Sequence, residues 1–291
     1  MRNFEELKAL LIEVKNNDYA VPTGVDVDDV VADMLKFIGH TDAELRDKLI
    51  YMTFMQWAEY KGVIKPAKLK EILDICLSET HLFYGIGEKH TDSVFTRAFS
   101  SLVISVALFV HSEIEAFLSK DDLICVKDTI LQYVGQEKDY RGYVVGKGWA
   151  HSIAHIADVL VNLSCCKVDD EYCIGRDGMA EILQAVKILV CNKEHIYDAQ
   201  EDERLLPVFL IASDRDMYNF TTEELIEWID SFSMADNQYW KGTMPDDFNL
   251  WMNRKNFMRS LYFRLQSNIK TEGFAEICEH MRGFLVEQDE D

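Results

Sequence analysis

The stretch Phe4-Glu5-Glu6-Leu7-Lys8-Ala9-Leu10-Leu11-Ile12-Glu13-Val14 decides the fold class, because its apolar residues recur at helical spacing. Its apolar positions 4, 7, 10, 11 and 14 share one face when each residue turns the helix by about 100°. Later segments of the chain repeat this pattern. Only four Pro and 14 Gly occur, too few for many short strands joined by tight turns, and alternating strand patterns are nearly absent. The sequence therefore predicts an all-α protein.

Caps and helix breakers give the expected bounds of the helices. Thr41 followed by Glu44 has the pattern of a capping box, Gly62 ends that helix, and Pro66 suits the first turn of the next. Connecting loops are expected at residues 81–87 and 138–148. The expected helices cover residues 4–14, 26–38, 41–60, 66–78, 93–117, 121–134, 149–164, 175–192, 203–213, 221–234, 246–270 and 272–287.

The order of these helices predicts an architecture. They form pairs that begin about every 35–50 residues, the spacing of stacked two-helix repeats. We therefore expect an α/α-superhelix of HEAT-like or armadillo-like helix pairs, with a compact irregular helical bundle as the alternative. No linker rich in Gly, Ser or Pro interrupts the chain, so one domain is expected over residues 1–291, with a frayed acidic tail at about 286–291.

The charge of the chain restricts its partners. Lys and Arg number 30 and Asp and Glu number 51, which gives a formal net charge of −21. Such a field repels nucleic-acid phosphates and anionic membrane surfaces, so we expect no nucleic-acid or membrane partner. A basic peptide or protein would be attracted, although an acidic surface can also serve solubility alone. The partner is expected to be an unknown protein or small-molecule ligand.

Apolar runs and cysteines predict a cytoplasmic location. Residues 1–6 carry acidic side chains where a secretory signal needs an apolar core. The longest apolar run, Leu102 to Val110, is interrupted by Ser105 and is shorter than the roughly 20 residues that span a bilayer. The seven cysteines are scattered, and the adjacent Cys165 and Cys166 do not suit a disulfide framework. A reducing compartment fits best.

The stretch from Trp149 to Asn162 contains the most unusual polar pattern. On a helix, His151, His155, Asp158 and Asn162 would lie within about 60° of one another. Two His at this spacing can bind one metal ion such as zinc, with Asp158 as third ligand or as the group that orients His155. The Glu that follows the first His in zinc proteases is missing. Alternatively, these residues satisfy one another in a buried polar strip, or bind a ligand beside Trp149 without metal.

Acidic and basic residues elsewhere supply further candidates. Glu203 is the candidate general base, with Asp202 beside it. Buried arginines need carboxylate partners, so Arg97, Arg259 or Arg264 could pair with Asp158, Asp202 or Glu203. Arg141, Lys147 and the helix start after Gly148 could hold an anion.

Several segments together resemble a family of bacterial proteins known as the domain of unknown function 2785. The resemblance spans about residues 80–265, and Trp149-Ala150-His151 with His155 is its most specific part. It implies a bacterial, cytoplasmic, helical protein, supplies no activity, and draws attention to Arg204 and Arg259 as binding candidates. The segments are Leu82-Phe83-Tyr84-Gly85-Ile86-Gly87-Glu88, Arg97-Ala98-Phe99-Ser100, Tyr140-Arg141-Gly142-Tyr143, Gly148-Trp149-Ala150-His151-Ser152-Ile153-Ala154-His155, Asp202-Glu203-Arg204-Leu205 and Arg259-Ser260-Leu261-Tyr262.

Three functions remain open at this point. The first is a HEAT-like scaffold whose concave surface, lined by the stripe from His151 to Asn162, binds a protein or small molecule. The second is a metal-dependent hydrolase with His151 and His155 as ligands, Asp158 as ligand or orienting group, and Glu203 as general base. In the third, the stripe only holds neighbouring helices together.

Overall fold

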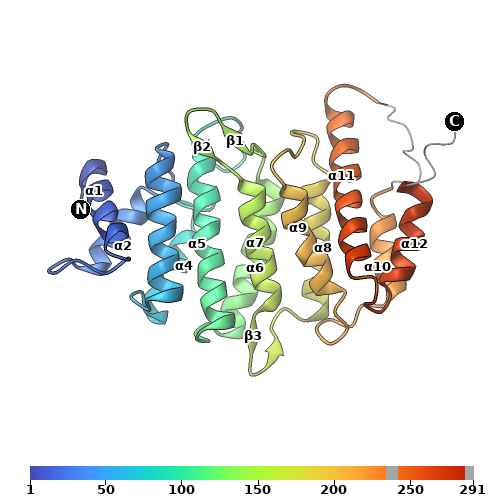
Figure 1. Ribbon diagram of the computed structural model, residues 1–291, viewed down its shortest axis with the longest axis horizontal. Helices are drawn as coiled ribbons and strands as arrows, with labels where there is room; N and C mark the ends of the chain where they lie inside the picture. Colours follow the sequence, from blue (N-terminus) through green and yellow to red (C-terminus); the bar gives the residue numbers. More distant parts are fainter. Residues whose placement is uncertain (234–241, 286–291) are drawn as a thin grey trace. The chain divides into compact units, whose positions relative to one another are not determined.

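Helices dominate the computed structural model, which describes residues 1–233 and 242–285 (Figure 1). The mostly helical prediction is therefore confirmed. The chain divides into two compact units, Met1–Cys173 and Ile174–Asp291. A single domain over residues 1–291 stays a prediction, and the expected acidic tail at 286–291 lies outside the described residues.

The first unit contains the helices that surround the candidate site, together with two short hairpins. Residues 44–60 form one continuous helical stretch in which π-type segments flank a short α-helix. The elements are α1 (Phe4–Asn16), α2 (Val27–Lys36), η1 (Glu44–Tyr51), α3 (Met52–Met55), η2 (Gln56–Tyr60), α4 (Pro66–Cys76), α5 (Ser93–Glu113), α6 (Lys120–Gln136), β1 (Tyr143–Val144), β2 (Gly148–Trp149), α7 (Ser152–Cys165), β3 (Lys167–Val168) and β4 (Glu171–Tyr172).

The described part of the second unit consists of helices and the loops that connect them. Within it, α8 packs on α9, α9 on α11, and α12 on both α10 and α11. Its elements are α8 (Gly175–Val190), α9 (Glu201–Ala212), α10 (Thr222–Asp230), α11 (Asp246–Ser267) and α12 (Phe274–Leu285).

The capping box expected at Thr41 and Glu44 is wrong. The oxygen Oδ1 of Asp42 accepts the hydrogen bond from the Leu45 backbone N–H at 2.9 Å, and Asp42 also binds Lys8 at 2.7 Å. The carboxylate of Asp42 therefore reaches the free N–H groups of the first turn in place of the Thr41 hydroxyl. Capping boxes do open other helices, at Asn3, Ser119 and Thr221.

The helix expected from Trp149 begins only at Ser152. Residues before it form an antiparallel hairpin, with Tyr143 opposite Trp149 and Val144 opposite Gly148. The hairpin was not predicted because strands of two residues carry no readable alternation of apolar and polar side chains. In the first unit of Figure 1, this hairpin lies at the end where α5 and α7 begin.

Helix α5 forms the core of the first unit and packs against α4 and along α7. The side chains from Val94 to Leu108 are almost all buried because apolar residues occupy every face of the helix. By length and composition alone α5 could cross a membrane, but 89% of its apolar window is buried inside the structure, and core helices pass the same test. The apolar character of α5 is therefore only weak evidence for a membrane span.

Glu59, in η2, gives the first unit a predicted pH dependence. Burial raises the pKa of this carboxyl from 4.5 to about 7. The folded state then holds a proton that the unfolded state releases between these values, so stability falls as pH rises through this window. We predict that Glu59→Gln, which cannot ionise, becomes more stable relative to wild type between pH 5 and pH 8. Thermal unfolding of both proteins across this range measures the difference. A difference that does not change with pH, or one that the exposed control Glu115→Gln shows to the same extent, would contradict the prediction.

Candidate functional site

The hairpin of residues 143–149 presents apolar side chains to solvent. The exposed fraction is 58% for Tyr143, 90% for Val145 and 40% for Trp149. Gly146 and Gly148 both adopt positive φ, at 79° and 84°, which lets the chain reverse within a few residues. A small hairpin is rarely stable by itself, so its conformation must come from the contacts at its base.

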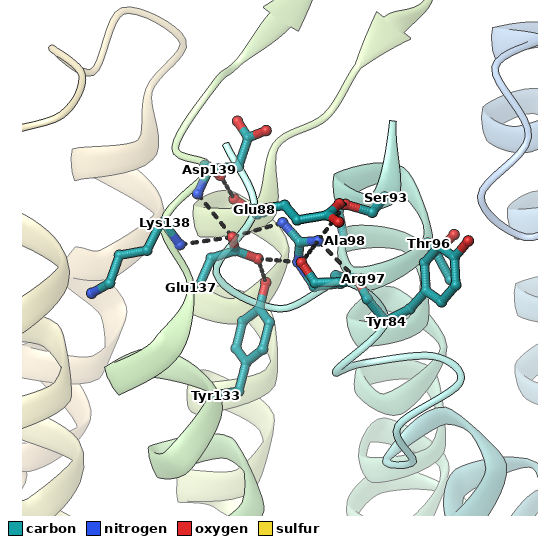
Figure 2. A network of polar contacts seen from close by, with 12 residues as sticks. Tyr84, Glu88, Ser93, Thr96, Arg97, Ala98, Tyr133, Glu137, Lys138 and Asp139 are labelled. Atoms are coloured by element: carbon teal, nitrogen blue, oxygen red, sulfur yellow. Dashed lines mark hydrogen bonds and ion pairs between the residues drawn. The ribbon is translucent and has the colours of Figure 1, made fainter. Parts of the chain in front are cut away.

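A fully buried ion pair lies beneath the hairpin (Figure 2). The guanidinium of Arg97, from α5, donates to both carboxylate oxygens of Glu137, at 2.6 and 2.8 Å, and both side chains are 0% exposed. Arg97 also donates to Ser93 Oγ at 2.8 Å and to the Tyr84 carbonyl at 3.0 Å. The hydroxyl of Tyr133 donates to Glu137 at 2.7 Å. Each buried charge is therefore surrounded by hydrogen-bond partners.

The electrostatics around Arg97 favour its charged form. Burial acts to lower the pKa of Arg97, but the hydrogen bonds and charge of Glu137 outweigh it and raise that pKa. Burial and the neighbouring Glu137 raise the pKa of Tyr133 well above its ordinary value, so its hydroxyl stays protonated and can donate. The network is thus a stable ionic cluster at neutral pH.

This cluster fixes the chain that leads into the hairpin. Glu137 accepts hydrogen bonds from the backbone N–H groups of Lys138 and Asp139, at 2.9 and 2.8 Å. Asp139 in turn accepts from the guanidinium of Arg141 at 2.8 and 2.6 Å, and its carbonyl accepts from Ser152 Oγ at 2.6 Å. The segment from α6 to the first hairpin strand is therefore anchored residue by residue.

A second buried arginine, Arg46, holds the other strand. Its guanidinium donates to the carbonyls of Lys147 and Trp149, at 2.8 and 3.3 Å, and lies 4.2 Å from the ring centre of Phe95. Burial lowers the pKa of Arg46, and the ion pair with Asp47 at 2.9 Å opposes this shift. The π-type segment η1 turns both Arg46 and Asp47 toward the hairpin, close to Gly148. Two buried guanidinium groups thus fix the two strands.

Aromatic and imidazole rings link the hairpin to the core. We call this series Tyr143, Trp149, His151, His155 and Phe99 the ring ladder. Its successive centroid distances are 5.0, 4.1, 5.8 and 5.2 Å, and only the contact between Trp149 and His151 is face to face. The ladder begins at an exposed ring and ends at a buried one, so its outer members have a fixed position.

The expected stripe on α7 divides into two parts. The prediction that His151 belongs to the helical row is wrong, because His151 precedes the helix and adopts a left-handed conformation with φ 51°. It still contacts His155. His155 Nδ1 lies 3.1 Å from the carbonyl oxygen of Ala98, and Asn162 donates to Ser105 Oγ at 2.8 Å. Asp158 is half-buried on the same helix. His155 and Asn162 therefore connect α7 to α5, and His151, at the beginning of the stripe, contacts the exposed ring of Trp149.

The metal site at His151, His155 and Asp158 stays an untested prediction. Among residues 1–233 and 242–285, no group of three or more His, Cys, Asp or Glu side chains is arranged to hold a metal ion. Zinc sites in proteins use three or four such ligands around one point. The arrangement of these side chains therefore gives no support to a metal-dependent hydrolase.

The cations expected to hold an anion already have carboxylate partners. Arg141 binds Asp139 and the Thr91 carbonyl, and Lys147 binds both oxygens of Asp92 at 2.7 Å. An incoming anion would have to compete with these carboxylates. The proposed anion site gains no support from these contacts.

The remaining predicted residues belong to the second unit. Asp202 accepts a hydrogen bond from Ser260 at 2.8 Å, and Glu203 pairs with Arg264 at 3.0 Å, one of the ion pairs that the sequence suggested. Arg204 and Arg259 are exposed. The role of Glu203 as a general base stays a prediction.

The partner expected for Arg97 is wrong, and the sequence did not indicate the most connected residues. Arg97 pairs with Glu137 instead of Asp158, Asp202 or Glu203. Glu137 follows directly after α6, where the chain turns toward the site, and Arg46 lies in a helix that resembled any other amphipathic segment. One sequence feature could have indicated this anchor. Glu137 and Asp139 lie on either side of Lys138 just after a helix, where charged side chains are well placed to anchor a loop.

The comparisons with known proteins agree with the segment that the geometry selects. A family model described as "Protein of unknown function (DUF2785)" matches residues 82–263. The matched range includes α5, Glu137, the hairpin and α7. No curated protein and no solved structure matches the chain.

Proposed function

The chain belongs to the DUF2785 family of proteins of unknown function, and we propose that it is a binding protein whose hairpin at residues 143–149 recognises a basic peptide segment of a partner. The observation that carries the proposal is the combination of an exposed apolar hairpin with a rigid, fully buried ionic base. Binding elements that are ordered beforehand lose less entropy when the partner arrives. We place this function in the cytoplasm, where the seven free cysteines would stay reduced.

HEAT-like helix pairs are the framework that we propose for this binding protein. In the first unit, α5 contacts α4 and α7, and α6 contacts α7. In the second unit, α9 contacts α8 and α11, and α10 contacts α12. Contacts between helices that are first or second neighbours in sequence are typical of stacked helical repeats, in which each repeat touches only its neighbours.

The chemistry of the hairpin favours a partner that is both apolar and cationic. Tyr143 and Trp149 offer aromatic surface, which attracts Lys and Arg side chains as well as apolar groups. The charges at the base of the hairpin are already paired, so local charge does not exclude either kind of partner. The net charge of −21 attracts basic segments over longer distances. A basic peptide with aromatic or aliphatic side chains satisfies both conditions.

Selection from a displayed library of random peptides tests this function. We predict that the wild-type protein enriches sequences rich in Lys and Arg, and that a synthetic peptide from the enriched set binds more weakly as salt increases. The double variant Tyr143→Ala, Trp149→Ala should lower the affinity for that peptide at least about tenfold, because aromatic residues are typical binding hot spots. Fluorescence anisotropy with a labelled peptide measures the affinity.

The matched control is Phe263→Ala in α11. Phe263 is 69% exposed, so its replacement removes a comparable exposed ring from another surface. This variant should leave peptide affinity unchanged. Selection of acidic or uncharged peptides, or an equal loss of affinity in the control and the double variant, would contradict the proposed function.

A further inference from the structure

Two adjoining cavities of the first unit lie outside the hairpin and take no part in the proposed function. The first has a volume of about 470 Å³ and lies between the end of α2, the loop before α5 and the first turn of α5. The second has a volume of about 280 Å³ and lies between α2 and α4. Leu35, Lys36 and His81 line both cavities. A single elongated ligand could therefore occupy the two together.

The two cavities differ in chemistry. Polar side chains line the first, among them Lys36, His40 and His81. Aliphatic side chains form half of the lining of the second, namely Val31, Ala32, Leu35, Ile72 and Ile75. Ile75 is 41% exposed although it is apolar, so a ligand there would remove apolar surface from water. The combination suits a molecule with a polar head and an apolar tail.

The donors in the first cavity suit an anionic head group. His40 Nδ1 accepts the backbone N–H of Asp42 at 3.1 Å, which leaves the ring proton on Nε2. His81 Nδ1 lies 3.0 Å from the Thr80 hydroxyl, while its buried Nε2 makes no hydrogen bond of normal geometry. Burial lowers the pKa of His81, and the Leu35 carbonyl acts in the opposite direction. His40 can therefore offer its Nε2–H group to a ligand, whereas the Nε2 atom of His81 is closed off beside the Leu35 carbonyl.

Lys36 supplies the positive charge. Its ammonium lies 4.8 Å from the ring centre of Phe37, and it forms no ion pair within the part of the chain that the structure describes. The other charges of the cavities are paired: Asp92 binds Lys147, and Glu71 and Asp28 approach Lys68 at 3.0 and 3.7 Å. Lys36 is thus the cation that remains available to a carboxylate.

We propose that these two cavities bind an amphipathic carboxylate such as a fatty acid, with its head at Lys36 and His40. Its tail lies along the aliphatic side chains between α2 and α4. The ligand is defined by three features on the same surface: one available cation, one imidazole donor and an adjoining apolar cavity.

Calorimetric titration with decanoate, below its micelle concentration, tests this site. We expect one decanoate to bind per chain, and acetate and decanol, which supply only the head or only the tail, to bind at least about tenfold more weakly. Lys36→Gln should lower the affinity for decanoate about tenfold, which is the loss expected when one charge-assisted hydrogen bond is removed. Ala32→Glu, which places a carboxylate in the apolar cavity, should also weaken it.

Lys15→Gln is the matched control, because Lys15 is exposed on α1 and lines neither cavity. It should bind decanoate like the wild type. The proposal is overturned if decanoate does not bind, if decanol binds equally well, or if Lys36→Gln and Lys15→Gln have the same effect. Peptide binding by the hairpin can succeed or fail independently of these results.

Discussion

Replacing Arg97 with alanine should lower the free energy of unfolding by about 3–5 kcal/mol, the cost of leaving a buried carboxylate without its partner. Glu137 would keep only neutral donors, from Tyr133 and two backbone N–H groups, in a site with 0% exposure. Urea denaturation followed by circular dichroism measures the change. We also expect the hairpin to lose its order, because Glu137 anchors the chain that leads to it.

The control for this prediction is Arg264→Ala, which breaks an exposed ion pair with Glu203. The side chains of that pair are 49% and 40% exposed, so the loss should stay below about 1 kcal/mol. Adding Glu137→Leu to Arg97→Ala should recover part of the lost stability, since no uncompensated charge then remains buried. Equal losses for Arg97→Ala and Arg264→Ala would contradict the role of the buried pair.

Gly148→Ala should destabilise the protein by about 2–4 kcal/mol, from a strained backbone together with a steric clash. The residue has φ 84°, and an added Cβ would lie 2.7 Å from Ala43 Cβ and 3.1 Å from Arg46 Nη2. Arg46 would have to move away from the strand that it holds. The change is therefore expected to lower peptide binding as well as the thermal unfolding temperature.

The variant Gly146→Ala separates the effect of backbone strain from that of the steric clash. Gly146 has a similar φ of 79° in the same hairpin, but an added Cβ would meet no atom within 4 Å. We expect this variant to lose only the backbone contribution of about 1–2 kcal/mol. If the two variants are equally stable in thermal unfolding, the close packing between η1 and the hairpin does not matter.

Helix bounds could be predicted from this sequence because they depend on local signals. Apolar spacing placed the helix that became α1, and a continuous apolar run placed α5. The same local signals failed at Thr41, where the neighbouring Asp42 competes for the same N–H groups. The spacing of apolar residues indicates where a helix lies because the helix and its buried face belong to one continuous segment of the chain.

The site depends on pairings between distant segments, which a single sequence does not reveal. Arg97 meets Glu137 across 40 residues, and Arg46 meets the carbonyl of Lys147 across 101. The stripe on α7 directed attention to the correct region, yet its middle and end serve to hold α5. Backbone carbonyls, which bind Arg46 and His155, leave no trace in side-chain patterns.

The position of the buried charges next to the hairpin suggests why they are present. Burying Arg46, Arg97 and Glu137 costs free energy that apolar residues would not cost. Arg46 contacts the segment that carries the exposed rings directly, and Arg97 is linked to it through Glu137, which binds the Asp139 backbone. We infer that these charges are placed to fix the conformation of that segment, in agreement with a recognition role.

Hydrogen exchange of the protein with and without a selected basic peptide tests the central claim most directly. The backbone N–H groups of Ala150 and His151 donate to Gly142 and Arg141 at 2.8 and 3.1 Å, so they should exchange slowly even in the free protein. Peptide binding should slow exchange further in residues 141–151. Fast exchange at these amides in the free protein, or protection by the peptide only in other segments, would contradict a pre-ordered recognition hairpin.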